Sequence, residues 1–302
     1  MEPVVTIGVC VRNSACTIRE AIVSIVGQDF PHELMEIILV DDGSEDATLA
    51  IAENHVSRMD IRAKIFHTEW RGLGPARNTV VDNAEGEYII WVDGDMRLPN
   101  DHVRKQIEFM EQNPRVGIAK AKYRLVPTDS TVATLEKVPL IIHDAKPGIM
   151  DRKLPGTGGA IYRVKALRQV RGFDDSLRGA GEDQDAAYRI RAAGWLLDHS
   201  PAVFYEEGVR TWKALWDKYL WYGYGNHDLH RKNRDIFSLH RMNPIAGFVA
   251  GILHVPVAYR VVARRDVFLL PFHHALKMIA WLLGFTEAHL YQIRAKPPTW
   301  ER

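Results

Sequence analysis

The stretch that decides the fold is residues 87–95, EYIIWVDGD, an apolar run that stops in two aspartates separated by one glycine. Short runs of β-branched and aromatic residues bounded by Asp and Gly are typical of buried strands. Two similar runs precede it, residues 4–11 (VVTIGVCV) and 36–42 (EIILVDD). Helix-like segments separate the runs. Strands that alternate with helices predict an α/β protein with a mostly parallel sheet and helices on both faces.

Acidic residues stand where these predicted strands end. Asp42 ends one strand, and Asp93 and Asp95 follow another. Ligands of such sheets bind beyond the carboxyl ends of the strands. Two carboxylates separated by one residue suit a hard cation such as Mn²⁺ or Mg²⁺. Tight turns also favour Asp and Gly, so this motif alone leaves both interpretations open.

Two further motifs are ambiguous when each is taken alone. Residues 72–78 (GLGPARN) only loosely resemble a phosphate-binding loop, because they lack its Lys-Ser/Thr pair. Arg77 could reach a diphosphate or form a surface ion pair. Residues 181–185 (GEDQD) place three carboxylates at a predicted helix start. The helix dipole stabilises acidic groups there, and one of them could also act as a general base.

Composition places the chain among ordinary globular proteins. It has 302 residues, of which 46% are hydrophobic and 25% charged. Its two cysteines, Cys10 and Cys16, form no disulfide framework, so a reducing compartment is expected. The N-terminal residues lead straight into a strand without a basic segment, and no secretory signal is predicted.

The C-terminal part differs in charge from the rest. Residues 1–207 carry 25 basic and 32 acidic side chains, whereas residues 208–302 carry 14 and 6. Two apolar segments, about 245–263 and 267–285, contain prolines and charges, so no ordinary membrane span is predicted. An aromatic-rich helix over 211–224 precedes them. With Arg260, Arg264 and Arg265, these segments indicate peripheral contact with an anionic membrane; a pair of core helices is the alternative. No nucleic-acid-binding module is recognised.

The motifs gain meaning from their order. Along the chain the sequence reads DDGS, GLGPARN, DGD, GTGGAIYR, GFDD and GEDQD. This order resembles glycosyltransferase family 2, the inverting nucleotide-sugar-dependent enzymes of the GT-A fold, over about residues 3–230. The resemblance implies a Rossmann-like catalytic domain over 1–230, with a nucleotide-binding part (about 1–125) and an acceptor-binding part (about 126–230). Residues 231–302 would form a C-terminal helical appendage, and we expect it to associate with a membrane.

The resemblance also implies roles for single residues. Matched motif by motif, it assigns the nucleotide-sugar to Val11, Arg12, Asn13, Asp42, Arg77, Asp93, Gly158 and Gly159, the metal to Asp95 with Asp93, and catalysis to Asp183 as general base with Glu182 beside it at the acceptor. One departure concerns the metal. Many family members carry a histidine after the strand that follows the base, whereas this chain reads VFYEE over 203–207. Whether Glu206 or Glu207 replaces the histidine stays open.

The function expected from this resemblance is inverting, Mn²⁺- or Mg²⁺-assisted transfer of a sugar from a UDP- or GDP-sugar to a hydroxyl. The acceptor would be lipid-linked or a glycan, and the enzyme would work at the cytoplasmic face of the membrane. Two alternatives remain. A nucleotidyltransferase would form the nucleotide-sugar, but residues 12–15 (RNSA) lack the glycines usual in its nucleotide loop. A catalytically inactive sugar-binding protein is the other.

Overall fold

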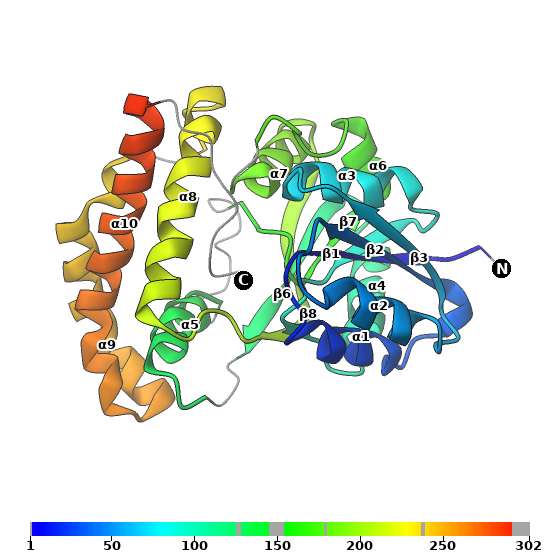
Figure 1. The fold of residues 1–302 in the computed structure, drawn as a ribbon, viewed down its shortest axis with the longest axis horizontal. Helices are drawn as coiled ribbons and strands as arrows, with labels where there is room; N and C mark the ends of the chain where they lie inside the picture. Colours follow the sequence, from blue (N-terminus) through cyan, green and yellow to red (C-terminus); the bar gives the residue numbers. More distant parts are fainter. Residues whose placement is uncertain (1, 125–127, 145–153, 178–179, 237–238, 292–302) are drawn as a thin grey trace.

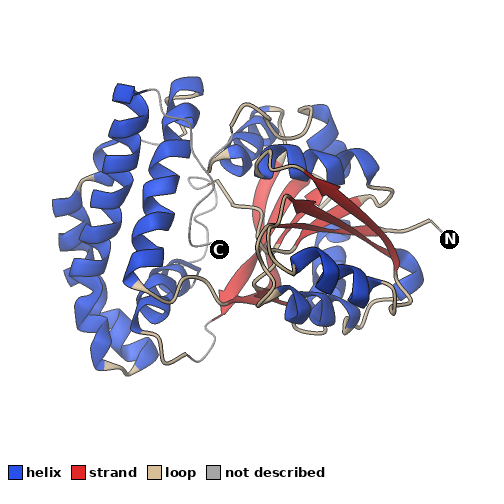
Figure 2. Cartoon of the chain, viewed as in Figure 1, coloured by secondary structure: helices blue, strands red, loops and turns tan. Residues whose placement is uncertain are grey.

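The computed structural model describes residues 2–124, 128–144, 154–177, 180–236 and 239–291. It consists of an α/β unit and a group of long helices beside it (Figure 1). In the α/β unit, helices lie on both faces of one sheet (Figure 2). The sequence predicts this layered α/β architecture and the C-terminal helical region, and both predictions are confirmed.

The sheet has eight strands in the order β3-β2-β1-β4-β7-β6-β8-β5. The half from β3 to β4 is parallel, as predicted. In the other half β7 runs antiparallel to both of its neighbours, and β5 runs antiparallel to β8, so the sheet as a whole is mixed. The strands are β1 (Val5–Val11), β2 (Met35–Asp42), β3 (Arg62–Thr68), β4 (Tyr88–Trp91), β5 (Met96–Arg97), β6 (Val116–Arg124), β7 (Ala160–Arg163) and β8 (Leu196–Glu206).

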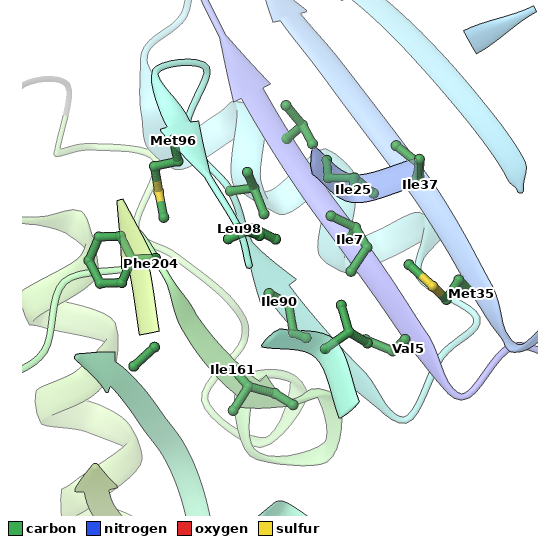
Figure 3. Packing of buried hydrophobic residues seen from close by; sticks show 14 of the residues in the cluster. Val5, Ile7, Ile25, Met35, Ile37, Ile90, Met96, Leu98, Ile161 and Phe204 are labelled. Carbon is green, nitrogen blue, oxygen red and sulfur yellow. The ribbon is translucent and has the colours of Figure 1, made fainter. Parts of the chain in front are cut away.

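The core lies on both faces of the central strands. Every residue of β1 and β2 is buried, which explains why their sequences are continuous apolar runs. On one face Ile7, Met35 and Ile37 pack with Ile25 of the helix α1 (Figure 3). Trp91 belongs to the opposite face. The helices of this unit are α1 (Ile18–Val26), α2 (Thr48–Val56), α3 (Leu73–Asn83), α4 (His102–Gln112), α6 (Val164–Gln169) and α7 (Glu182–Ala192).

The remaining helices form the second group. They are α5 (Thr131–Asp144), α8 (Trp212–Lys232), α9 (Pro244–Val262) and α10 (Leu270–Tyr291). Helix α8 and helix α10 lie side by side (Figure 1). Backbone packs directly on backbone there, since a Cβ at Gly223 or Gly284 would collide with the facing helix. Glycine is therefore required at both positions.

A buried polar network joins three of these helices. Glu136 of α5 accepts hydrogen bonds from the Tyr219 hydroxyl of α8 (2.8 Å) and the Lys277 ammonium of α10 (2.8 Å). The His273 ring lies 3.4 Å from the same carboxylate. All four side chains are buried or half-buried. Because buried charges are stable only when paired, this network fixes α5 against α8 and α10.

Two local sequence patterns differ from the structure. Residues 125–155 show no clear period, which indicates a long functional loop or insertion, yet α5 occupies much of the stretch; residues 125–127 and 145–153 lie outside the described part of the chain. Pro139 and the buried polar residues of α5 obscure its helical period, because polar side chains stand at core positions. The order Thr17-Ile18-Arg19-Glu20 indicates a capping box at the start of α1, but the Thr17 hydroxyl donates to the Ser14 carbonyl oxygen instead.

Candidate active site

The loops after β1 and β2 are joined to each other at the carboxyl edge of the sheet. Arg12 donates to the Gly43 carbonyl oxygen (3.2 Å) and pairs with Glu45 (3.2 Å). The backbone amide of Glu45 in turn donates to the Asn13 side-chain oxygen (2.8 Å). Asn13 has a positive φ of 49°, a conformation that Asn tolerates better than most residues. These bonds bring two of the predicted nucleotide-binding residues beside the end of β2.

Asp42 anchors the next loop. Its carboxylate accepts hydrogen bonds from the backbone amides of Arg71 and Gly72, both at 2.8 Å. Burial raises the pKa of Asp42 above its ordinary value, although these two hydrogen bonds act in the opposite direction. Asp42 therefore holds the start of α3 against β2. Val11, at the end of β1, lies opposite Asp41 in the register with β2, is buried and packs against Gly94.

Asp93 and Asp95 form the turn between β4 and β5. The amide of Met96 donates to the Asp93 carbonyl oxygen (3.0 Å), which closes the turn. The carboxylate of Asp95 accepts from the Gly208 amide (3.1 Å), just beyond β8. Burial, followed by the charges of Glu206 and Asp93, raises the pKa of Asp95 to about 7. Burial also raises the pKa of Asp93. Three carboxylates thus crowd one end of the sheet.

A glycine-rich turn, residues 156–159, lies between the turn at Asp93 and Asp95 and the predicted base, Asp183. A Cβ at Gly158 would collide with the Asp93 carboxylate, and one at Gly156 would lie 3.1 Å from the Asp183 carboxylate. The two carboxylates therefore flank the same short turn. Gly159 has a positive φ of 68° and its amide donates to the Trp91 carbonyl oxygen (2.9 Å), which leads the chain into β7. The turn needs glycine because side chains there would fill the space beside both acids.

Arg77 and Glu182 form a buried ion pair with each other. Their side chains are 6% and 2% exposed, although 105 residues separate them in the sequence. Burial disfavours a charged guanidinium, but the carboxylates of Glu182, Asp183 and Asp93 outweigh it and hold the pKa of Arg77 above its ordinary value. The pair ties α3 to the first turn of α7. Asp183, the next residue, is half-buried, and its carboxylate accepts a hydrogen bond from the Gln184 amide (2.7 Å).

The residues present fit a hard divalent cation, but they do not form a closed cage for one. In the described parts of the chain no three His, Cys, Asp or Glu side chains converge as a metal site. Mg²⁺ and Mn²⁺ need only one or two protein carboxylates when substrate phosphates and water complete the shell. Asp93 and Asp95 offer oxygen donors whose mutual repulsion a cation would relieve. Asp95, with Asp93, would therefore hold the metal.

Comparison with known proteins identifies the family. The profile of "Glycosyl transferase family 2" matches residues 6–171, which include the loops after β1, β2 and β4 and the glycine turn. The chain belongs to glycosyltransferase family 2. An uncharacterized glycosyltransferase of Haemophilus influenzae is 37% identical over 112 residues, and the putative glycosyltransferase EpsE of Bacillus subtilis is 28% identical over 210 residues. These alignments cover 37% and 69% of this chain, and 44% and 69% of the relatives.

Solved structures agree on the GT-A fold of this family 2 enzyme. A mannosyltransferase from Pyrobaculum calidifontis, solved with GDP-Man and Mn²⁺, superposes with a TM-score of 0.67 at 20% identity, covering 97% of this chain and 88% of that one. Residues 1–349 of Staphylococcus aureus TarS, solved with UDP-GlcNAc, superpose with a TM-score of 0.53 at 19% identity, covering 96% and 92%. The family match places the chain with glycosyltransferases and not with nucleotidyltransferases.

Three lysines that the sequence analysis did not single out also lie near the carboxylates of this site. Lys137 of α5 pairs with Glu206 (3.1 Å), and the Lys120 ammonium donates to the Gly158 carbonyl oxygen. Against the effect of burial, the charges of the Asp95 and Glu206 carboxylates raise the pKa of Lys218 on α8. Isolated lysines form no motif that can be recognised in a sequence. The one feature that could have pointed to a basic partner here is Glu206, which stands where many family members carry a histidine.

Proposed function

We propose that this glycosyltransferase moves a sugar, with inversion, from a UDP- or GDP-sugar to a hydroxyl of a lipid-linked or glycan acceptor. Asp183 is the general base. The observation that carries the proposal is the placement of Asp183 and Asp93 on either side of the turn 156–158. A base and a diphosphate-binding acid must lie close together, because the reacting carbon stands between the acceptor hydroxyl and the leaving group.

The donor would bind at the carboxyl ends of β1 and β2. Val11, Arg12 and Asn13 would line one side of this pocket, and Asp42 would border it; Arg12 and Asn13 are already held beside the end of β2 by their hydrogen bonds. Gly158 and Gly159 would leave room for the sugar beside Asp93. The GDP-Man and UDP-GlcNAc held by the two GT-A structures support a nucleotide-sugar of one of these classes.

The reaction would proceed by a single displacement. The acceptor oxygen forms a bond to the anomeric carbon while the bond from that carbon to the diphosphate oxygen breaks. Asp183 accepts the proton from the attacking hydroxyl. A metal held by Asp95 and Asp93 would neutralise charge on the leaving diphosphate. Arg77 and Glu182 fix the start of α7, so we assign Glu182 a positioning role next to the base.

Donor identity is tested by thermal unfolding of the full chain with UDP-, GDP- and other nucleotide-sugars, each with and without Mn²⁺. A ligand at 100 times its Kd stabilises the folded state by about 2.7 kcal/mol. We expect one nucleotide class to raise the Tm, and only when Mn²⁺ is present. The stabilising donor is then tested for transfer. Binding without transfer to any lipid-linked or glycan acceptor would favour the inactive sugar-binding alternative.

We also propose that the outer face of α9 and α10 contacts an anionic membrane. Two helices, Pro244–Val262 and Arg265–Leu290, are long and apolar enough to cross a bilayer. Large apolar side chains project from them, with Ile245 75%, Leu253 70% and Phe272 63% exposed. Arg260 and Arg265 are exposed at the connection between the helices. Apolar side chains flanked by cations are typical of a peripheral interfacial contact.

The membrane contact is tested by flotation with phosphatidylcholine vesicles that contain phosphatidylglycerol. Burying one large apolar side chain is worth about 1.5–3 kcal/mol, so Leu253→Asp with Phe272→Asp should weaken binding at least about tenfold. The matched control is Val23→Asp, an exposed valine on α1 in the α/β unit. Equal binding of the control and the double variant would contradict the proposed face.

A further inference from the structure

A lysine on β6 holds the glycine-rich turn 156–159. The ammonium of Lys120 donates hydrogen bonds to the carbonyl oxygens of Gly156 (3.4 Å) and Gly158. Lys120 also stands opposite Ala160 in the register between β6 and β7, directly beyond the turn. One cation therefore binds two peptide groups of the same turn, and hydrogen bonds from a charged donor are stronger than those between neutral groups.

The Lys120 side chain is itself fixed by its surroundings. Its ammonium lies 5.0 Å from the ring centroid of Phe204 on β8, and a Cβ at Gly159 would collide with the same ring. The Lys120 side chain is half-buried. A cation over an aromatic ring is stabilised more strongly as water is excluded from it. Lys120 and Phe204 therefore support the turn together.

The turn contains a buried backbone amide that has no partner. Thr157 is 2% exposed, and its carbonyl oxygen accepts a hydrogen bond from the Ala160 amide (2.7 Å). Its own amide makes no hydrogen bond to any residue that the structure describes. Buried amides without a partner are rare in folded proteins, because each costs about as much free energy as a lost hydrogen bond. The Thr157 amide is therefore a candidate donor to a bound molecule.

The hydrogen bonds from Lys120 determine where this amide points. The peptide bond between Gly156 and Thr157 is trans, so its C=O and N–H groups point in opposite directions. Since the Gly156 carbonyl points toward Lys120, the Thr157 N–H points away from it. This part of the turn lies between the carboxylates of Asp183 and Asp93. The transferred sugar would stand in the same region.

We propose that Lys120 is a positioning residue: it holds the turn so that the Thr157 amide donates a hydrogen bond to an oxygen atom of the transferred sugar. This inference rests on the proposed function, because it takes the bound donor to be a nucleotide-sugar. Any sugar offers hydroxyl or ring oxygens that accept such a bond. A nucleoside diphosphate lacks the sugar, so its affinity should not depend on this amide.

The first test compares the affinities of the full chain for a nucleoside diphosphate and for the corresponding nucleotide-sugar, by calorimetry with saturating Mn²⁺. The ligands are UDP with UDP-GlcNAc, and GDP with GDP-Man. Lys120→Met keeps most of the side-chain length but removes the donor. It should weaken binding of the nucleotide-sugar by about 2–10-fold, as expected for one hydrogen bond, and leave the affinity for the nucleoside diphosphate unchanged.

Lys122→Met is the matched control, because it removes the same charge from an exposed lysine of the same strand. It should leave both affinities unchanged. Lys120→Arg keeps a cation with hydrogen-bond donors and should bind the nucleotide-sugar within a few-fold of the wild type. With saturating donor, Lys120→Met should also lower kcat by about 10–100-fold, since a displacement of about 1 Å can cost a factor of about 10².

A measurement on the wild type tests the amide directly and does not depend on the folding of a lysine variant. The protein is isotope-labelled on threonine nitrogen, and the Thr157 amide resonance is assigned through its loss in Thr157→Ser. This resonance should shift when the nucleotide-sugar replaces the nucleoside diphosphate, and the amide should then exchange more slowly with deuterated solvent.

The outcomes separate this inference from the proposed function. The role of Lys120 is overturned if Lys120→Met binds the nucleotide-sugar like the wild type, if it weakens both ligands equally, or if Lys122→Met shows the same loss. The role of the amide is overturned if the Thr157 resonance is identical in the two complexes. A wild type that binds the nucleoside diphosphate but no nucleotide-sugar would contradict the proposed function itself.

Discussion

Replacing Asp183 by Asn should lower the rate of sugar transfer by about 10²–10⁴-fold, the usual cost of losing a positioned general base. The amide keeps the size of the carboxylate but cannot accept the proton of the attacking hydroxyl. The effect should appear in kcat, because the proposed nucleotide pocket would be formed by the loops after β1 and β2, whereas Asp183 lies on α7. The measurement is initial-rate transfer with saturating donor and Mn²⁺.

Asp101→Asn is the matched control for Asp183→Asn. Asp101 also stands at a helix start, at the N-cap of α4, and pairs with Lys105 on the surface. Its amide variant should transfer sugar at the wild-type rate. The affinity of both variants for the nucleoside diphosphate should match the wild type within about twofold, which would show that the fold and the pocket persist. Wild-type turnover by Asp183→Asn would exclude this residue as the base.

The half of the site formed by β1, β2 and β4 could be predicted because local sequence determines it. Buried parallel strands are continuous apolar runs, and the acids that follow them must meet at one edge of the sheet. The position of Asp42, Asp93 and Asp95 at this edge was found in this way, and their roles stay predictions. Their hydrogen-bond partners were not found, because the bond from the Gly208 amide to Asp95 depends on the course of the chain beyond β8.

Contacts between distant segments were beyond prediction. Arg77 was expected near the nucleotide and Glu182 near the acceptor, yet they pair with each other across 105 residues. The aromatic helix was expected to face lipid headgroups, which stays a prediction; Tyr219 on this helix hydrogen-bonds Glu136 of α5. Charge and aromatic content predict that a helix has a special face, but only tertiary packing decides what the face contacts.

The division into domains stays a prediction. The boundary expected near residue 230 would fall inside α8, whose 21 residues run from Trp212 to Lys232. Because α8 packs backbone on backbone with α10 through Gly223 and Gly284, we propose that the helical region begins at α8. The acceptor-binding surface would then be shared between the α/β unit and this region.

Replacing Asp95 by Asn should abolish the dependence of transfer on Mn²⁺ and lower its rate by about 10²–10³-fold. A cation on a departing diphosphate contributes several kcal/mol, and each 1.36 kcal/mol corresponds to a factor of ten. Transfer is measured against Mn²⁺ concentration. Asp101→Asn is again the matched control, since this carboxylate pairs with Lys105 (2.6 Å) away from the proposed metal site. An unchanged Mn²⁺ requirement in Asp95→Asn would place the metal elsewhere.

The pH dependence of Mn²⁺ affinity provides an independent test of the same residue. With a pKa of about 7, the metal-free Asp95 carboxyl retains its proton through mildly acidic pH, and the metal must displace it. Mn²⁺ affinity should therefore rise about tenfold per pH unit between pH 5 and 7 and level off above that. A carboxyl with a raised pKa stabilises the metal-free fold below about pH 4, and this contribution is lost as the pH rises through 7. Stabilisation by Mn²⁺ should consequently be largest above pH 7, and Asp95→Asn should remove this rise.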